Sequence, residues 1–292
     1  MKVGLLDVLG ARQMRYWNTF LNELGVKVVT PTLPAEDAYE LGRRSLPDVP
    51  VQVQLVLGRL LELGNVDLAL LPSTRAVSQD AWASDLAELL PRRISGLPTL
   101  RAVPDGGPEL TGAALELGQQ LTHNASQVRL ALSKVKLLAQ PPRESLPPLS
   151  APARPTVAVI GPDSLLRDAF LTGPLRAKLG NLALHPVWAD QLPREQVEER
   201  GQRFSTPSGK PLPPGERDLW GAQNLLEGKG AVRGLIYLAP LRDAATLGAL
   251  TRLSGTARKP ALLLELAPEL SDWPELAAFV TRLAAPPQEH PL

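Results

Sequence analysis

The side chains with the most chemical potential in this chain follow four apolar segments, at the points where each segment ends. Parallel strands all end at one edge of a sheet, and open α/β sheets bind ligands outside the carboxyl ends of their strands. The loops at these points therefore predict a ligand site before any motif is considered. The candidate ligand-binding residues chosen in this way are Asp7, Arg12, Ser73, Thr74, Arg75, Gly161, Asp163, Arg242 and Asp243.

These residue types suit an anionic ligand, and each also has a purely structural interpretation. Arginine beside a helix N-terminus can bind an anion, because the backbone N–H groups there already favour negative charge. Surface arginines are more often simply solvated. Asp7 and Asp163, or the Ser73–Thr74 pair, are also suitable N-caps for the helices that follow them. The sequence leaves both interpretations open.

The common phosphate-binding motifs are missing from these loops. Neither the stretch from Gly4 to Gly10 nor Gly161 begins a G-x-G-x-x-G sequence, and no G-x-x-x-x-G-K-[ST] occurs. The 31 Lys and Arg residues are nearly balanced by 30 Asp and Glu residues, which leaves a formal net charge of +1. A broad nucleic-acid interface usually needs a clear basic excess. The sequence therefore indicates no nucleic-acid binding and no motif for nucleotide phosphates.

The chain contains no cysteine and only three histidines, His123, His185 and His290. Without cysteine it has no disulfides, thiol nucleophiles, cysteine-ligated zinc or conventional iron–sulfur clusters. The histidines lie far apart in the sequence and indicate no metal site, so we expect neither metal nor cofactor. The N-terminus does not resemble a signal peptide, and no apolar run approaches 18 residues. We therefore expect a cytoplasmic protein with no membrane association.

Apolar segments of strand length alternate with segments of helical periodicity in both halves of the chain. This alternation predicts an α/β protein with two doubly wound, Rossmann-like domains and mostly parallel sheets. The expected strands are residues 2–8, 26–29, 66–71, 99–103, 156–161, 182–187, 232–238 and 260–266. The expected helices lie between these strands, and two of them are expected within residues 109–139, meeting near His123 and Asn124.

A proline-rich stretch divides the chain. Six prolines between residues 141 and 155 prevent a helix or a central strand and favour an extended connector. We therefore predict an N-terminal α/β domain over residues 1–140 and a linker over 141–155. The C-terminal α/β domain is expected over 156–285, and a frayed tail over 286–292.

Scattered segments along nearly the whole chain resemble 2-hydroxyacyl-CoA dehydratase component-D-like proteins and the related domain fused to the acyl-CoA dehydratase activases. The first of these segments is Val3-Gly4-Leu5-Leu6, and the first segment in the second half of the chain begins at Val157. The similar segments are residues 3–6, 17–21, 24–29, 39–42, 57–60, 66–67, 157–162, 234–238, 259–264 and 277–283.

The resemblance implies two nitrogenase-like α/β domains around an interdomain cleft, where loop cysteines of family members hold an iron–sulfur cluster for the dehydration of CoA thioesters. It places those cysteines near Pro50, at Ser73 and near Asp243, none of which is a cysteine here. An acidic, histidine-containing stretch of the family is replaced at residues 267–269. Serine, proline and aspartate do not reproduce thiolate ligation of a cluster. The resemblance therefore supports the fold and the cleft, and it argues against the family's redox chemistry.

Three hypotheses of function follow. The first is a non-redox ligand-binding or protein-interaction role at the interdomain cleft, in a relative that has lost the cluster. The second is a cofactor-independent enzyme acting on an acyl-CoA or another anionic small molecule, which requires that the arginines and acids of the loops converge. The third is a homo-oligomeric scaffold, which an apolar patch on the helices of residues 109–139 would favour.

Overall fold

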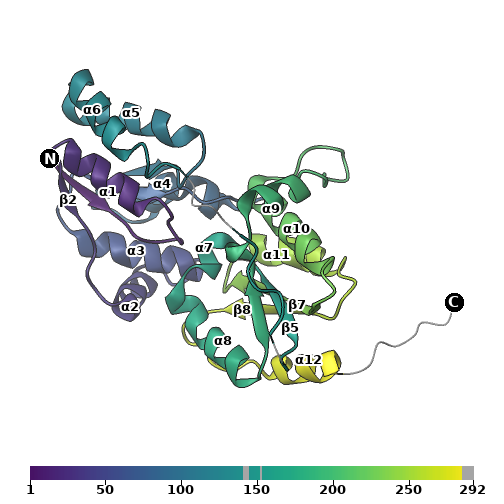
Figure 1. Cartoon of the computed structure of the whole chain (residues 1–292). Coiled ribbons are helices and arrows are strands. Elements are labelled where there is room, and N and C mark those ends of the chain that lie inside the picture. The colour runs from purple at the N-terminus through teal and green to yellow at the C-terminus, as the bar shows by residue number, and fades with distance from the viewer. Residues whose placement is uncertain (141–144, 152, 285–292) are drawn as a thin grey trace. The chain divides into compact units, whose positions relative to one another are not determined.

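The structure, a computed structural model, describes residues 1–140, 145–151 and 153–284. It contains two four-stranded sheets, in the orders β2-β1-β3-β4 and β6-β5-β7-β8, and every strand pair in them is parallel (Figure 1). Helices flank both sheets, which confirms the predicted α/β class with two Rossmann-like parallel sheets. The predicted tail and residues 141–144 and 152 of the predicted linker lie outside the described residues.

The chain separates into two compact units. The first comprises Met1–Arg75 and Asp80–Arg143, and the second comprises Ala76–Gln79 and Glu144–Leu292. Its first-unit elements are β1 (Lys2–Leu5), α1 (Met14–Glu23), β2 (Lys27–Val29), α2 (Ala35–Ser45), α3 (Val51–Leu63), β3 (Leu68–Pro72), α4 (Ala81–Arg93), β4 (Thr99–Val103), α5 (Glu109–Thr122) and α6 (Ala125–Val135).

The second unit also alternates strands and helices, but it has an extra short helix after its first strand, a 3₁₀ helix after its second, and one described helix rather than two after its last. Its elements are β5 (Thr156–Ile160), α7 (Asp163–Leu166), α8 (Ala169–Asn181), β6 (His185–Trp188), the short 3₁₀ helix η1 (Ala189–Gln191), α9 (Arg194–Gly201), α10 (Pro214–Glu227), β7 (Val232–Pro240), α11 (Ala244–Ser254), β8 (Ala261–Leu266) and α12 (Pro274–Ala284).

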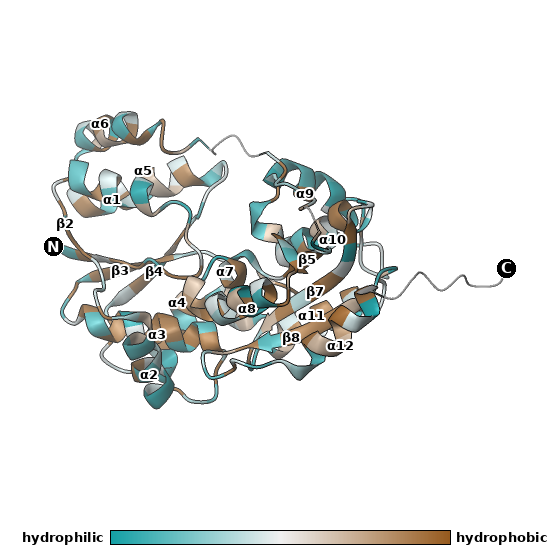
Figure 2. Cartoon of the chain, turned by 60° about the horizontal axis from the view of Figure 1, so that its bottom comes forward, coloured by the Kyte–Doolittle hydropathy of each residue, from teal (hydrophilic) through white to brown (hydrophobic). Residues whose placement is uncertain are grey.

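Alternating side chains of the first sheet supply two separate cores. Val3, Leu5, Leu68 and Leu70 pack against α1, α5 and α6 on one face. Side chains of the opposite alternation, Ala69 among them, pack against α3 and α4 on the other face. All five residues of β3 and all five of β5 are buried, and in Figure 2 β5 is drawn mainly in the hydrophobic colour. This pattern is expected of a central strand covered on both faces.

The first strand is shorter than predicted, because the chain turns sharply after it. Strand β1 ends at Leu5 rather than at Val8. Leu9 and Gly10 both adopt left-handed backbone conformations, with φ of 56° and 67°, and the Ala11 N–H donates to the Val8 carbonyl over 3.1 Å. The turn carries the chain from the end of β1 to the start of α1, which is the position a ligand loop occupies in folds of this type.

Each unit contains a pair of helices that touch through glycines. A Cβ atom on Gly58 of α3 would overlap the carbonyl oxygen of Ala38 in α2, and one on Gly42 of α2 would overlap that of Gln54 in α3. The second unit has the same reciprocal arrangement between Gly201 of α9 and Gly221 of α10. In both pairs each glycine faces the carbonyl four residues before the partner glycine. These backbones approach so closely that only hydrogen fits between them.

We expect Gly58→Ala to destabilise the first unit by about 3 kcal/mol, because the methyl group must force α2 and α3 apart. Gly112→Ala is the matched control, since a Cβ on this α5 glycine meets nothing within 4 Å. That change is expected to stabilise the helix by about 0.5–1 kcal/mol. Urea unfolding followed by circular dichroism measures both effects. Equal free energies of unfolding for the two variants would contradict the close approach.

Candidate functional site

The loops at the carboxyl edge of the first sheet do not gather all their predicted residues into one site. Asp7 is exposed, and it does not cap α1, whose N-cap is Gln13. Ser73 is exposed, and its N–H donates to the Val103 carbonyl over 2.8 Å. The Thr74 hydroxyl donates to the carbonyl of Ala83 over 3.1 Å. The predictions that Asp7 or the Ser73–Thr74 pair cap the following helices are therefore wrong.

The two arginines of these loops are half-buried. Arg12 lies in the turn before α1, and Arg75 lies at the end of the first-unit segment that follows β3. The prediction that they bind an anion stays a prediction. The helix that follows Arg75 is capped instead by Asp80, whose carboxylate accepts from the Ala83 N–H over 2.9 Å.

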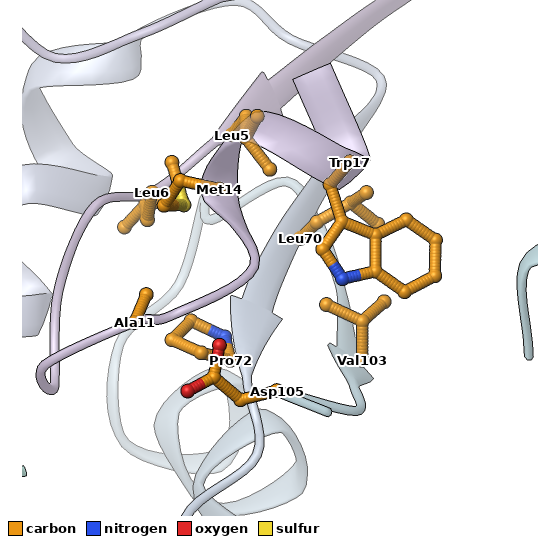
Figure 3. A pocket seen from close by; sticks show the side chains of 9 residues that line it. All are labelled: Leu5, Leu6, Ala11, Met14, Trp17, Leu70, Pro72, Val103 and Asp105. Carbon is orange, nitrogen blue, oxygen red and sulfur yellow. The ribbon is translucent and has the colours of Figure 1, made fainter. Parts of the chain in front are cut away.

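A small apolar pocket lies where β1, β3 and β4 end (Figure 3). Its cavity of about 10 Å³ has room for roughly one water molecule. Figure 3 shows Trp17 and Met14 from α1 facing Val103 and Pro72, with the Asp105 carboxylate below them. The lining residues are Leu5, Leu6, Ala11, Met14, Trp17, Leu70, Pro72, Val103 and Asp105. A pocket of this size does not accommodate a nucleotide or a CoA thioester.

The Asp105 carboxylate binds the backbone directly before the first residue of α1. It accepts hydrogen bonds from the backbone N–H groups of Arg12 and Gln13, over 2.6 and 2.9 Å. Gln13 is the N-cap residue of α1 and Arg12 precedes it, so the carboxylate lies at the positive end of the helix dipole, where anions bind favourably. Asp105 lies 92 residues after Gln13, in the loop that follows β4. Neither local spacing nor a helix-capping pattern could have found it.

We expect Asp105→Ala to lower the free energy of unfolding of the first unit by about 1–2 kcal/mol, because two backbone donors lose their acceptor. Asp105→Asn keeps one carbonyl oxygen and is expected to lose less. Chemical denaturation of the two variants beside wild type measures the difference. If Asp105→Ala were as stable as wild type, the carboxylate would not contribute to stability through these two N–H groups.

Carboxylates also occupy the helix starts at the carboxyl edge of the second sheet. Asp168 accepts from the Phe170 and Leu171 N–H groups over 3.0 and 3.1 Å at the start of α8. Asp243, a predicted ligand residue, accepts from the Thr246 N–H over 2.9 Å at the start of α11. An incoming anion at either helix would meet a negative charge rather than vacant donors.

The remaining predicted residues of the second unit have different roles. Asp163 is the first residue of α7, whose N-cap position is Pro162, so the prediction that Asp163 is an N-cap is wrong. Gly161 is buried, and a Cβ there would come within 2.7 Å of the Leu238 carbonyl oxygen, so it serves close packing of β5 against β7. Arg242 is exposed, with a left-handed φ of 66° in the turn after β7.

Asp163 instead belongs to a group of charged side chains at the carboxyl ends of β5 and β6. The group, which we name the charged cluster, interacts electrostatically through Asp163 and Asp190. Asp190 lies on η1, directly after β6, and η1 packs against α7 and β5. The charged cluster consists of Asp163, Arg167, Arg176, Asp190, Arg194, Glu198 and Asp218.

Arg176 of α8 is held in place on three sides. Its guanidinium carbon lies 3.6 Å from the ring centroid of Trp188, a cation–π contact. The same group donates to the Leu166 carbonyl over 2.9 Å and to the Thr172 hydroxyl over 3.2 Å. Burial lowers the pKa of Arg176, and the nearby charge of Asp190 opposes that shift. A guanidinium fixed in this way presents its charge with little loss of side-chain freedom.

Asp190 has the most perturbed environment among the acids of the charged cluster. Its Oδ1 atom is buried and has no hydrogen-bond partner among the described residues. Burial raises the pKa of the Asp190 carboxyl, and the carboxylate of Asp163 raises it further. Arg167 and Arg176 oppose this shift without cancelling it. Asp190 therefore holds its proton to a higher pH than an ordinary aspartate.

Arg194, at the start of α9, interacts with three acids of the charged cluster, Asp163, Glu198 and Asp218. Its Nε donates to Glu198 over 3.2 Å. Burial lowers the pKa of Arg194, but Asp218, Glu198 and Asp163 together raise it above the usual value. The positive charge of Arg194 is thus stabilised by these three acids. Arg167 and Arg176 are the cations that act on Asp190.

Sequence reasoning found Asp163 and missed its partners. Asp190 directly follows the apolar segment Val187–Trp188–Ala189, so the rule that selected the other loops applies equally to it. Arg176 gave no such signal, because it lies in the interior of α8.

Among the described residues, no group of three or more histidine, cysteine, aspartate or glutamate side chains is arranged to hold a metal ion. None of the helices in that part of the chain is long and apolar enough to cross a membrane.

The raised pKa of Asp190 predicts the sign of its effect on stability. A carboxyl with a higher pKa in the folded state contributes stability below its unfolded pKa, and that contribution is lost as the pH rises through the folded pKa. We therefore expect Asp190→Asn to be more stable than wild type at pH 8. The difference should be smallest below pH of about 4, the ordinary aspartate pKa.

Thermal unfolding from pH 4 to pH 8 tests this effect, with Asp272→Asn as the control. Asp272 is exposed, and its hydrogen bond to Lys178 over 2.9 Å lowers the pKa of its carboxyl. Its replacement should bring no gain at pH 8. A uniform stability difference between Asp190→Asn and wild type across this range would show that Asp190 titrates normally.

Comparison with known proteins leaves the chain without an assigned family. No family model matches it, and no curated protein matches it. Two solved structures of Ca. Korarchaeum cryptofilum dinucleotide forming acetyl-coenzyme A synthetase 1, one in complex with phosphate and ADP and one in the apo form, align with 11% and 10% identity. Both alignments cover 96% of this chain and 58% of that chain, with a TM-score of 0.20. The chain thus spans less than two thirds of the synthetase, and a likeness this distant carries no argument about fold or function.

Proposed function

We propose that this protein binds a small polar molecule and that the binding site is the charged cluster of the second unit. The observation that carries the proposal is the buried, unpartnered Oδ1 atom of Asp190 at the carboxyl end of β6. A buried polar atom without a partner costs free energy, which a ligand can recover. The edge of the sheet where it lies is the edge that binds ligands in open α/β folds.

The arrangement of Arg176 and Arg167 supports binding rather than structure alone. Arg176 is already fixed by Trp188, Thr172 and Leu166, whereas Arg167 is exposed at the end of α7. An oriented cation beside an exposed one is a suitable pair for a carboxylate or a phosphate group. Ion-pair networks can also serve stability alone, and the binding test below separates the two roles.

The resemblance to the 2-hydroxyacyl-CoA dehydratase component-D-like family, which no comparison tests, makes acetyl-CoA a reasonable first probe. We propose a role without redox chemistry, because the chain lacks the thiolates that the family's cluster needs.

The scaffold hypothesis depends on apolar side chains at the surface of the segment 109–139. Three leucines of this segment, Leu115, Leu130 and Leu137, are exposed by 37%, 59% and 77%. Single exposed leucines are common on monomeric proteins, so they do not favour a scaffold.

The proposal predicts that acetyl-CoA or inorganic sulfate raises the melting temperature of the full chain, because a ligand selective for the folded state stabilises it. Arg167→Gln should weaken the binding of either probe about tenfold, the usual loss for one charge-assisted hydrogen bond. Arg233→Gln is the matched control, since Arg233 is exposed near the amino end of β7 in the same sheet. Calorimetric titration measures the affinities.

Two outcomes would contradict the proposal. The first is that neither probe stabilises the chain at millimolar concentration. The second is that both probes bind Arg167→Gln as tightly as they bind wild type. In the second case the anion binds elsewhere.

A second candidate function is proton transfer on a bound anion without a cofactor. It is favoured by the raised pKa of Asp190, because a carboxyl whose pKa lies closer to neutral pH is better matched to exchange a proton with a bound molecule. Incubation with acetyl-CoA in deuterated water would show exchange of the acetyl protons if this holds. Exchange that persists in Asp190→Asn would exclude Asp190 as the base.

A further inference from the structure

The charge around Asp190 constrains which ligand the charged cluster takes. Three charged groups act directly on the Asp190 carboxyl: Asp163 at the start of α7, Arg167 at the end of α7 and Arg176 from α8. With Asp190 ionised, two positive and two negative charges cancel. With Asp190 protonated, the same four groups carry a net charge of +1. Protonation therefore removes one negative charge from the immediate surroundings of an incoming anion.

The charged groups farther from Asp190 change the total charge but not the effect of protonation. Arg194 of α9 interacts with Glu198 of the same helix, with Asp218 of α10 and with Asp163. Arg194, Glu198 and Asp218 together add one negative charge, so protonation of Asp190 takes the whole charged cluster from a net charge of −1 to zero. His185 lies at the amino end of β6, opposite to Asp190, and its Nε2 lies 2.9 Å from the Pro148 carbonyl oxygen. The nearest titratable histidine on this strand thus belongs to the other edge of the sheet.

Burial of the Asp190 Oδ1 atom also favours the protonated form of this side chain. An ionised carboxylate with one oxygen buried and unpartnered is disfavoured, because burial penalises a charge more than a neutral polar group. The neutral acid also gains an O–H donor that the carboxylate lacks. An anion beside Arg167 and Arg176 would meet a donor in the protonated form and a repelling charge in the ionised form.

We propose that the ligand of the charged cluster is an anion, and that Asp190 takes up one proton from solvent when the anion binds. This inference rests on the proposed function and names the class of its ligand. The proton stays on the Asp190 carboxyl, and no covalent bond of the ligand changes. Binding is therefore tighter at low pH, and it weakens as the pH rises above the pKa of Asp190 in the unliganded protein. The slope approaches a tenfold loss for each pH unit.

Sulfate is the probe for the test, because it does not change its own charge between pH 5 and pH 8. Calorimetric titration of the full chain with sulfate, repeated in two buffers of different ionisation enthalpy, counts the protons taken up. We expect proton uptake approaching one in the pH range above the pKa of Asp190, and an affinity that falls with rising pH. A ¹³C NMR titration of the Asp190 carboxyl carbon is expected to show a higher pKa with sulfate than without it.

Asp190→Asn supplies the decisive variant, because its uncharged side chain imitates the neutral acid. It should bind sulfate with no proton uptake, with an affinity that does not vary with pH, and more tightly than wild type at pH 8. Asp272→Asn, which lies outside the charged cluster, should behave as wild type. Circular dichroism confirms that both variants are folded before the titrations.

The outcomes separate this inference from the proposed function. Sulfate binding that depends on Arg167 but involves no proton uptake and no shift of the Asp190 pKa would overturn the inference and leave the proposed function standing. Binding of acetyl-CoA through Arg167 without proton uptake would do the same. Failure of both probes to bind wild type would overturn both.

Discussion

Both sheets are wholly parallel, and their central strands are buried on both faces. The rest of the structure depends on this constraint. Parallel strands need a crossover between every pair, and the crossovers must supply the helices that cover both faces. All the strands of a sheet then end at one edge. The same requirement that buries Leu70 and Val159 therefore gathers distant loops of the chain at a single place.

The crossovers must also fit in the space above the sheet. Between the second and third strands of each unit the chain forms two helices rather than one, and these lie in backbone contact at Gly42 and Gly58 or at Gly201 and Gly221. A side chain at any of these positions would lift the outer helix from its partner. Helix α10, which carries Asp218 of the charged cluster, is one of the helices positioned by such a contact.

The sequence predicts the fold better than the site because the two depend on different distances along the chain. The apolar run Thr156–Ile160 forms a strand within one residue of the predicted bounds, since burial of a central strand leaves a local pattern. The separation of α5 from α6 at His123 follows from a left-handed residue and the Asn124 cap, which are also local. Asp105 and Arg176 act through residues far away or through a helix interior, where the sequence carries no local signal.

The carboxylate at the start of α1 has a consequence for selectivity. Asp105 is attached to the same chain as the N–H groups that it binds, so it competes with dissolved ions at a high effective concentration. Phosphate compounds at ordinary cellular levels would have to displace a tethered competitor that never diffuses away. A free anion at the start of α1 would therefore bind these N–H groups only by displacing the Asp105 carboxylate.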